Sequence, residues 1–372
     1  MFSIKSRVRV RARDIKIPFE GTHGKLNSIT DVKGIEVGMT TIIDNEKGIR
    51  TGCTAIIPRG KKNKKLSPIW AGIYCLNGNG EMTGSHWIKD AGYFLSPIIL
   101  TNTHSIGIAH HSVLKWMINN YDDFIDQEVW ITPVVAETFD GVLNDIHGLH
   151  LKEEHVLKAL ETADSSLPLE GNSGGGTGMI TYGYKGGTGT SSRIVKIPEI
   201  KEEYTLGVLV QANNGTRREF RVKGVPLLQE KDEKKIFHED IDKGSIIIII
   251  ATDAPLMPNQ LERIARRGSF GIARNGTSGN NGSGDIFLAF STAEKNSCNM
   301  FSTNKKKSLE YLDDELLNYF YRATIEAIEE AVLNAMCMAE EMISFNPSGE
   351  LIPTVSKELI IKTLKYHNLL KK

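Results

Sequence analysis

The sequence has no excess of charge of either sign and no long apolar run. Lys and Arg together number 45, and Asp and Glu together also number 45, so the formal net charge is zero. Without a positive surplus to follow a phosphate backbone, nucleic acid is disfavoured as the main partner. The longest apolar run, Ile246–Ala251, has six residues, whereas a membrane-spanning helix needs about 18. The sequence therefore predicts no membrane span.

Cysteine is scarce and follows no pattern. The four cysteines have no CxxC spacing, so neither a disulfide framework nor a thiolate metal site is predicted: Cys53, Cys75, Cys298 and Cys337. The first ten residues are basic but lack the apolar run of about 7 to 15 residues that a secretory signal needs. Both features favour a reducing cytoplasm as the location.

Several signatures of catalytic and binding sites are also missing. His147, His150 and His155 lie close together, but HExxH is absent and their intervals of 3 and 5 residues match no known zinc site, so no metal site is predicted. GxxxxGK[ST] does not occur, and no GxGxxG opens a helix after a clear strand. We expect no cofactor. A glycine-loop nucleotide-binding module without catalysis stays open as an alternative.

Glycine is abundant and unevenly distributed. The chain has 35 glycines, nine of them between Gly171 and Gly189. Because glycine has no Cβ, such a segment is typical of a tight turn or of two backbones that approach closely. We expect that role here rather than a phosphate-binding loop.

Hydrophobic periodicity predicts helices and strands within one intertwined domain that spans residues 1–372, because no repeat and no low-complexity linker divides the chain. Helices are predicted at Leu151–Thr162, Pro258–Arg267, Ser308–Tyr319 and Ala323–Ile343. Strands are predicted as a hairpin of Tyr204–Ala212 with Arg218–Val222, as the buried run Ile246–Ile250, and as a second hairpin of Ser269–Arg274 with Asp285–Ser291. We expect a layered α/β or α+β fold.

The junction of Gly244 and Ser245 stands out from its surroundings. A charged stretch, Val225–Gly244, which we interpret as a solvated loop, meets the isoleucine strand here, and local structure gives no reason for the serine. A serine after a glycine can attack the preceding carbonyl, and hydrolysis of the resulting ester would cut the chain. The new amino terminus, with a pKa of about 7.7 to 8.0, would be a suitable base beside its own hydroxyl.

A series of short blocks lies in a recognisable order between Arg11 and Ile343. They are Arg11–Ile15, Ile17–Gly21, Ile29–Val32, Val37–Gly38, Thr51–Gly52, Pro58–Gly60, Asn77–Gly84, Pro133–Thr138, Gly189–Arg193, Val210–Asn213, Gly244–Ser245, Ala251–Leu256 and Asn281–Asp285. In these blocks and their order the sequence resembles the L-aminopeptidase/D-alanyl-esterase/amidase family of the DmpA type, which includes the β-peptidyl aminopeptidases.

This resemblance implies a self-cleaving hydrolase of the N-terminal-nucleophile type, built as a four-layer αββα sandwich of the DmpA and ornithine acetyltransferase type. Cleavage between Gly244 and Ser245 would give subunits 1–244 and 245–372. Ser245 would be the nucleophile and Asn213 would stabilise the oxyanion. Ser283 and Asp285 match the family's serine and acidic residue that support the nucleophile; some relatives carry Glu in place of the Asp.

The resemblance also implies an aminopeptidase or amidase for short peptides, amides or esters with a free amino terminus. Glu137 would receive the substrate ammonium. Phe139 stands where some relatives have a tyrosine, so the hydroxyl that helps at the substrate is missing here. Relatives assemble as oligomers, so a homo-oligomer of cleaved protomers is expected. The alternative within the fold is an acyltransferase, although the related ornithine acetyltransferases use threonine as the nucleophile.

Overall fold

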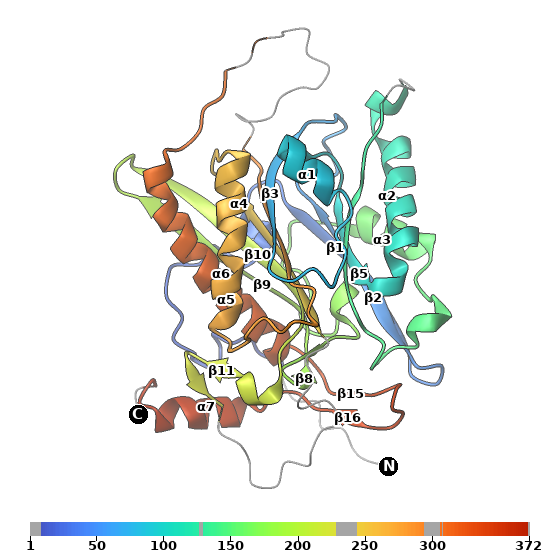
Figure 1. Cartoon of the computed structure of the whole chain (residues 1–372), viewed down its shortest axis with the longest axis vertical. Coiled ribbons are helices and arrows are strands. Elements are labelled where there is room, and N and C mark those ends of the chain that lie inside the picture. Colours follow the sequence, from blue (N-terminus) through green and yellow to red (C-terminus); the bar gives the residue numbers. More distant parts are fainter. Residues whose placement is uncertain (1–8, 126–128, 228–243, 294–305, 307, 371–372) are drawn as a thin grey trace.

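A computed structural model describes residues 9–125, 129–227, 244–293, 306 and 308–370. Within these residues, two β-sheets lie face to face and helices cover the outer face of each sheet (Figure 1). None of the described helices combines the length and the apolar character needed to cross a membrane.

One sheet has four strands in the order β1-β2-β5-β6, and the other has six in the order β4-β3-β14-β13-β10-β9. The smaller sheet consists of β1 (Glu36–Asp44), β2 (Ile49–Ile57), β5 (Ile98–Asn102) and β6 (Val134–Thr138). The larger consists of β3 (Ile69–Cys75), β4 (Tyr93–Phe94), β9 (Gly187–Ile197), β10 (Glu202–Asn213), β13 (Ser245–Thr252) and β14 (Ile286–Ser291). Neighbouring strands are antiparallel except β5 with β6 and β13 with β14, which are parallel.

Short strand pairs and helices complete the fold. The pairs are β7 (Ile180–Thr181) with β8 (Tyr184–Lys185), β11 (Arg221–Val222) with β12 (Val225–Pro226), and β15 (Met342–Ile343) with β16 (Leu351–Ile352). The helices are α1 (Ser85–Ala91), α2 (Ile106–Asn120), α3 (Glu153–Thr162), α4 (Pro258–Arg266), α5 (Gly268–Ala273), α6 (Leu317–Cys337) and α7 (Lys357–Tyr366).

Three apolar layers follow from the alternation of side chains along the strands. In β13, Ile247 and Ile249 face the smaller sheet, whereas Ile246, Ile248 and Ile250 face the layer that contains α4, α5 and α6. The opposite face of the smaller sheet packs on α2 and α3. A strand buried on both faces needs apolar residues throughout, which explains the isoleucine run. The layers confirm the predicted αββα sandwich.

Both predicted hairpins are wrong, each for a local reason. β10 ends at Asn213 as expected, but its partners are β9 and β13. Of the predicted second strand, Arg218 and Glu219 lie in a 3-10 helix, and only Arg221–Val222 pair, with Val225–Pro226 outside the large sheet. Ser269–Arg274, predicted as a strand, lies in and just after helix α5, because only Arg267 separates α4 from α5 and Gly268 already begins the second helix. Most of the charged stretch Val225–Gly244 lies outside the described residues.

The predicted helix ends also need correction. Leu151–Thr162 is helical from Glu153, and Pro258–Arg267 is confirmed as α4. The two helices predicted at Ser308–Tyr319 and Ala323–Ile343 are one helix, α6, which begins at Leu317 and ends at Cys337. Ser308–Asp313 is not helical, and Met342–Ile343 is strand β15. The acidic residues at 313–315 precede α6, where its N-terminal dipole favours them.

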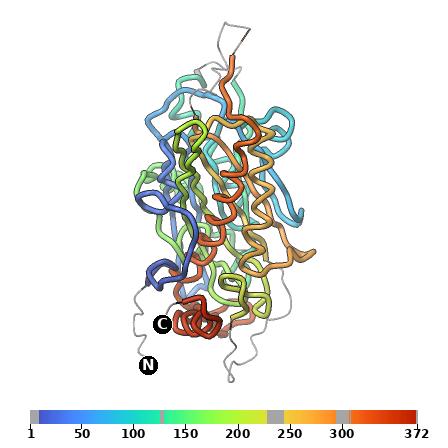
Figure 2. The backbone as a smooth tube through the Cα atoms, turned by 90° about the vertical axis from the view of Figure 1, so that its left-hand side faces the viewer, coloured from blue at the N-terminus to red at the C-terminus, as the bar shows by residue number. Residues whose placement is uncertain are grey.

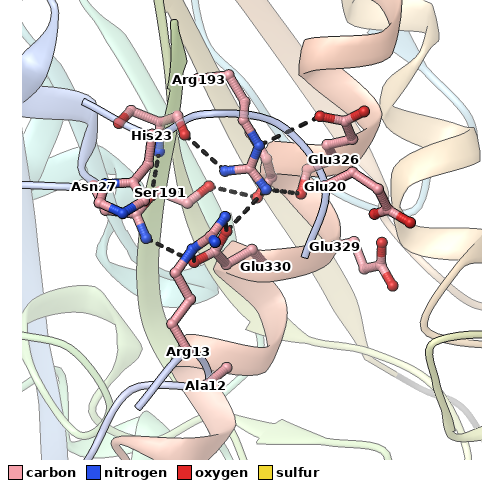
Figure 3. A network of polar contacts seen from close by, with 12 residues as sticks. Ala12, Arg13, Glu20, His23, Asn27, Ser191, Arg193, Glu326, Glu329 and Glu330 are labelled. Atoms are coloured by element: carbon pink, nitrogen blue, oxygen red, sulfur yellow. Dashed lines mark hydrogen bonds and ion pairs between the residues drawn. The ribbon is translucent and has the colours of Figure 1, made fainter. Parts of the chain in front are cut away.

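An ion-pair network connects α6 to the N-terminal arm, the described segment that precedes β1 (residues 9–35). Figure 2 shows α6 (red-orange) between this arm (dark blue) and helices α4 and α5 (orange). Glu330 of α6 contacts both Arg13, at 2.7 Å, and the buried Arg193 of β9, at 2.8 Å (Figure 3). Arg193 also pairs with Glu326, and Asn27 donates to Glu330. The paired charges are buried together, so removing one partner would leave the other uncompensated.

Candidate active site

Ser245 lies where three strand ends meet. It is the first residue of β13 and is paired in register with Asn213, the last residue of the antiparallel strand β10. The parallel neighbour β14 begins at Ile286, directly after Asp285. Ser245 is 5% exposed, and its Oγ accepts a 3.0 Å hydrogen bond from the backbone N–H of Gly284. The nucleophile predicted from the sequence therefore sits on a rigid central strand.

Gly244 is sterically required before Ser245. A Cβ at this position would lie 1.7 Å from the carbonyl oxygen of Asn213 and 3.1 Å from the Cα of Asn214. Such an overlap cannot be relieved by a side-chain movement, because both neighbours are backbone atoms. The Gly-Ser pair is thus explained by the close approach of the chain to β10 rather than by a turn.

Ser283 and Asp285 lie beside the start of β13, the strand that Ser245 begins. The Ser283 hydroxyl donates a 2.6 Å hydrogen bond to Asp285 Oδ1, and the backbone N–H of Ile246 donates to the same oxygen at 3.2 Å. Asn77 Nδ2 donates to the other carboxylate oxygen at 3.4 Å. Ser283 and Asp285 are each 1% exposed. The carboxylate is therefore fixed to the backbone of the residue that follows Ser245.

No side chain acts as an evident base for Ser245. Among the described residues, neither an imidazole nor a carboxylate hydrogen-bonds its hydroxyl, whose bonding partner is the Gly284 N–H. A serine nucleophile with an adjacent histidine would show such a contact. Another group close by therefore has to accept the proton of this hydroxyl.

Asn213 carries a side-chain amide held at both ends. Its Oδ1 accepts from the backbone N–H of Ile180 at 2.7 Å, and its Nδ2 donates to the carbonyl of Phe139 at 2.9 Å. A primary amide has two N–H donors, so this bond to Phe139 uses one of them. The amide is a fixed donor on the residue opposite Ser245, which suits the role predicted for it.

Glu137 is a buried carboxylate without a cation partner in the described part of the chain. It is the last residue but one of β6, is 4% exposed, and accepts hydrogen bonds from the Thr103 hydroxyl and, at 3.0 Å, from the Glu81 backbone N–H. Burial raises its pKa. A methyl group on Gly80 would lie 3.3 Å from both Glu137 Oε1 and the Cα of Gly284, so Glu137 lies beside the segment that binds Ser245 Oγ.

Phe139 contributes to the site through its backbone. Its side chain is 42% exposed, whereas its carbonyl accepts the hydrogen bond from Asn213. The ring has no hydroxyl with which to bind a substrate.

The glycine-rich segment is a close-packed turn. Gly174–Gly176 is buried, and its first two N–H groups donate to the hydroxyls of Thr41 and Thr54. A Cβ on Gly175 would lie 2.0 Å from Gln211 Oε1. These amides are bonded inside the protein, which argues against a phosphate-binding loop and confirms the expected close approach. The described residues contain no group of three or more His, Cys, Asp or Glu that could hold a metal ion.

The sequence did not single out several residues that complete this site: Asn77, Thr103, Ile180 and Gly284. Ile180 and Gly284 act through their backbone N–H groups, which every residue except proline has, so residue type does not reveal them. Thr103 acts through its hydroxyl, which binds Glu137. Asn77 falls in the Asn77–Gly84 block that resembles the family, so its position was signalled but its contact with Asp285 was not.

Residues 27–348 match the model of peptidase family S58. The chain belongs to this family. It is 42% identical over 380 residues to "Beta-peptidyl aminopeptidase BapA" of Sphingosinicella microcystinivorans, an alignment that covers 96% of this chain and 93% of the relative. The predicted family is thereby confirmed.

Solved structures agree with this assignment. The L-aminopeptidase D-Ala-esterase/amidase of Ochrobactrum anthropi, described as a prototype of the serine aminopeptidases and a variant of the Ntn-hydrolase fold, matches with a TM-score of 0.91 and 47% identity, covering 97% of this chain and 99% of that one. A Burkholderia sp. beta-aminopeptidase matches with a TM-score of 0.84 and 38% identity, covering 96% and 99%. The S58 protein described here is therefore a peptide hydrolase with an N-terminal-nucleophile fold.

Proposed function

We propose that this S58 protein cuts itself between Gly244 and Ser245 and then acts as a serine aminopeptidase or amidase that forms an acyl-enzyme on Ser245. The observation that carries the proposal is the position of Ser245, which is buried and begins a central strand. Among the described residues, no side-chain base hydrogen-bonds its hydroxyl. A free α-amine on Ser245 itself would supply the missing base.

Maturation is an N-to-O acyl shift followed by hydrolysis. Ser245 Oγ attacks the Gly244 carbonyl carbon, the C–N bond breaks, and the nitrogen leaves as an amine that takes up the hydroxyl proton. Water then hydrolyses the ester, which gives a carboxylate on Gly244 and restores the Ser245 hydroxyl beside a free amine. The close packing at Gly244 supports this step, because the residue whose carbonyl is attacked lies directly against the end of β10.

Turnover repeats the same chemistry on a substrate. The Ser245 amine accepts the hydroxyl proton while Oγ attacks the substrate carbonyl, and the protonated amine then passes that proton to the leaving group. The developing oxyanion is stabilised by the Asn213 amide, and the bonded pair of Ser283 and Asp285 orients the backbone around the nucleophile. Hydrolysis of the acyl-enzyme releases the amino acid.

Glu137 restricts the substrates to those with a free amine. A buried carboxylate without a cation is completed by an incoming ammonium group, which explains release from the amino terminus. The relatives named beta-peptidyl aminopeptidase and L-aminopeptidase D-Ala-esterase/amidase support short peptides, amides and esters as the substrate class. We further propose that the enzyme works in the cytoplasm as a homo-oligomer of cleaved protomers, without a cofactor.

The decisive experiment is mass spectrometry of the purified protein before and after prolonged incubation. We expect fragments of 244 and 128 residues, the smaller one beginning at Ser245. Ser245→Ala should abolish both the cut and turnover of aminoacyl amides. A wild-type chain that stays intact and still turns over these substrates would contradict the proposal.

A further inference from the structure

Lys185 is a buried cation that the proposed mechanism does not use. It is the last residue of β8 and has 0% exposure. Its Nζ donates to the carbonyls of Gly186 at 2.8 Å, Met179 at 2.9 Å and Gly176 at 3.4 Å. In the part of the chain that the structure describes, no carboxylate bonds this ammonium. A charge buried against neutral partners alone is costly, so its position calls for a reason.

The contact with Met179 connects Lys185 to the active site. The Met179 carbonyl and the Ile180 N–H belong to one planar peptide group. Its oxygen accepts from the Lys185 ammonium, and its N–H donates to Asn213 Oδ1 at 2.7 Å. The β7–β8 register places Lys185 directly opposite Ile180. A continuous chain of hydrogen bonds therefore runs from the ammonium through one peptide group to the Asn213 amide.

This chain has two effects on Asn213. The Ile180 N–H can only donate, so it must face the amide oxygen of Asn213. This fixes the amide with Oδ1 toward Ile180 and with its donor nitrogen, Nδ2, toward Phe139. A cation on the peptide oxygen also polarises the N–H at the other end, and successive hydrogen bonds strengthen one another in a buried site. Both effects make Nδ2 a better-placed and stronger donor.

We propose that Lys185 is a positioning residue that orients and polarises the Asn213 side-chain amide through the Met179–Ile180 peptide. The inference rests on the proposed role of Asn213 as the oxyanion donor. Lys185 itself contacts neither the nucleophile nor the substrate.

The test is a double-mutant cycle on incubated, fully cleaved protein. Lys185→Met keeps the length of the side chain and removes its charge and donors; we expect kcat to fall about a hundredfold with KM little changed, the size typical of a misplaced catalytic group. In the Asn213→Ala background, the same substitution should cost almost nothing further, because it acts through the amide that is already absent. Losses that multiply would overturn the proposal.

A matched control separates positioning from general destabilisation. Thr324→Val removes a buried hydrogen bond to the Phe320 carbonyl inside α6, away from the site. We expect a lower melting temperature with unchanged kcat. If Asn213→Ala itself leaves kcat unchanged, the proposed function of Asn213 fails; if only Lys185→Met leaves it unchanged, the present inference fails.

A second variant keeps the proposal testable should Lys185→Met not fold. Burial lowers the pKa of Lys185 to about 7, so its charge is lost as the pH rises through that value, whereas arginine stays charged. The ratio of kcat in Lys185→Arg to kcat in the wild type should therefore rise between about pH 7 and 9. Every other titrating group is common to both proteins, and a ratio that does not change with pH would overturn the proposal.

Discussion

Ser283 and Asp285 form a 2.6 Å hydrogen bond whose acceptor oxygen also binds the backbone N–H of Ile246. The pair is thereby tied to the residue that follows Ser245, the proposed nucleophile. A carboxylate held in this way carries both geometry and negative charge to the strand end, where the liberated Ser245 amine would be located.

Asp285→Asn should keep the shape of this contact and remove its charge. We expect a loss in kcat of about a hundredfold, the lower range for groups that assist proton transfer. The matched control is Asp253→Asn, since Asp253 also accepts a backbone N–H, from Thr205, near the opposite end of β13. Steady-state kinetics on an aminoacyl amide measures both. Equal, small effects of the two substitutions would contradict a role for Asp285.

Asn213→Ala should lower kcat by about a hundredfold or more while the protein stays folded, the usual cost of one oxyanion donor. The next residue provides the control, because the Asn214 side chain is buried and its amide has no hydrogen-bond partner among the described residues. Asn214→Ala should retain most of the activity. If both variants turn over at the wild-type rate, Asn213 does not stabilise the oxyanion.

Glu137→Gln should abolish the preference for free amines. The amide no longer attracts an ammonium, so kcat/KM for a free aminoacyl amide should fall about tenfold or more relative to the same compound N-acetylated. Glu81→Gln is the control, because the hydrogen bond from Glu81 to Glu137 comes from the backbone N–H, which this substitution keeps. Unchanged selectivity in Glu137→Gln would reject it as the ammonium partner.

Asp140 should make stability depend on pH. Burial raises its pKa to about 6 although Thr51, Asn144 and Asn102 donate to it. Folding therefore favours its protonated form, and this contribution is present below about pH 4 and lost as the pH rises through about 6. The free energy of unfolding of the wild type minus that of Asp140→Asn should fall by about 3 kcal/mol over this range. Urea titrations at each pH measure it, and a constant difference would contradict the prediction.

Arg193 should contribute strongly to the free energy of unfolding of the protein. Arg193→Met leaves the buried Glu330 with one cation fewer, and we expect a loss of about 3 to 5 kcal/mol in the free energy of unfolding. The exposed pair of Arg263 and Asp314 is the control, with an expected loss of about 0 to 1 kcal/mol in Arg263→Ala. Similar losses in the two variants would show that the buried network contributes nothing special.

The sequence carried most of the information on burial and on side-chain chemistry. The isoleucine run predicts β13 because β-branched, wholly apolar residues fit a strand covered on both faces, and β10 ends at Asn213 as expected. The αββα arrangement came from the family resemblance, as did the assignment of Ser283, Asp285 and Glu137.

Which strands pair with one another could not be predicted from the sequence in the same way. Arg218–Val222 alternates like a strand, but the place beside β10 that a hairpin would have given it is taken by β13, which begins 23 residues after Val222. Ser269–Arg274 has the composition of a short strand and becomes α5 because it packs against α6. Ile180 and Gly284 act through backbone N–H groups, whose positions depend on tertiary structure alone.

Because β13 lies between β10 and β14, the two proposed products share one sheet: the first supplies β10 and the second supplies β13 and β14. A gene for the second piece alone would start it with an initiator methionine, which would block the amine of the serine. Synthesis as a single polypeptide that cleaves itself after folding avoids both the separate assembly of the shared sheet and the blocking methionine. The sheet forms from one intact chain, and the serine becomes an amino terminus only within the folded site.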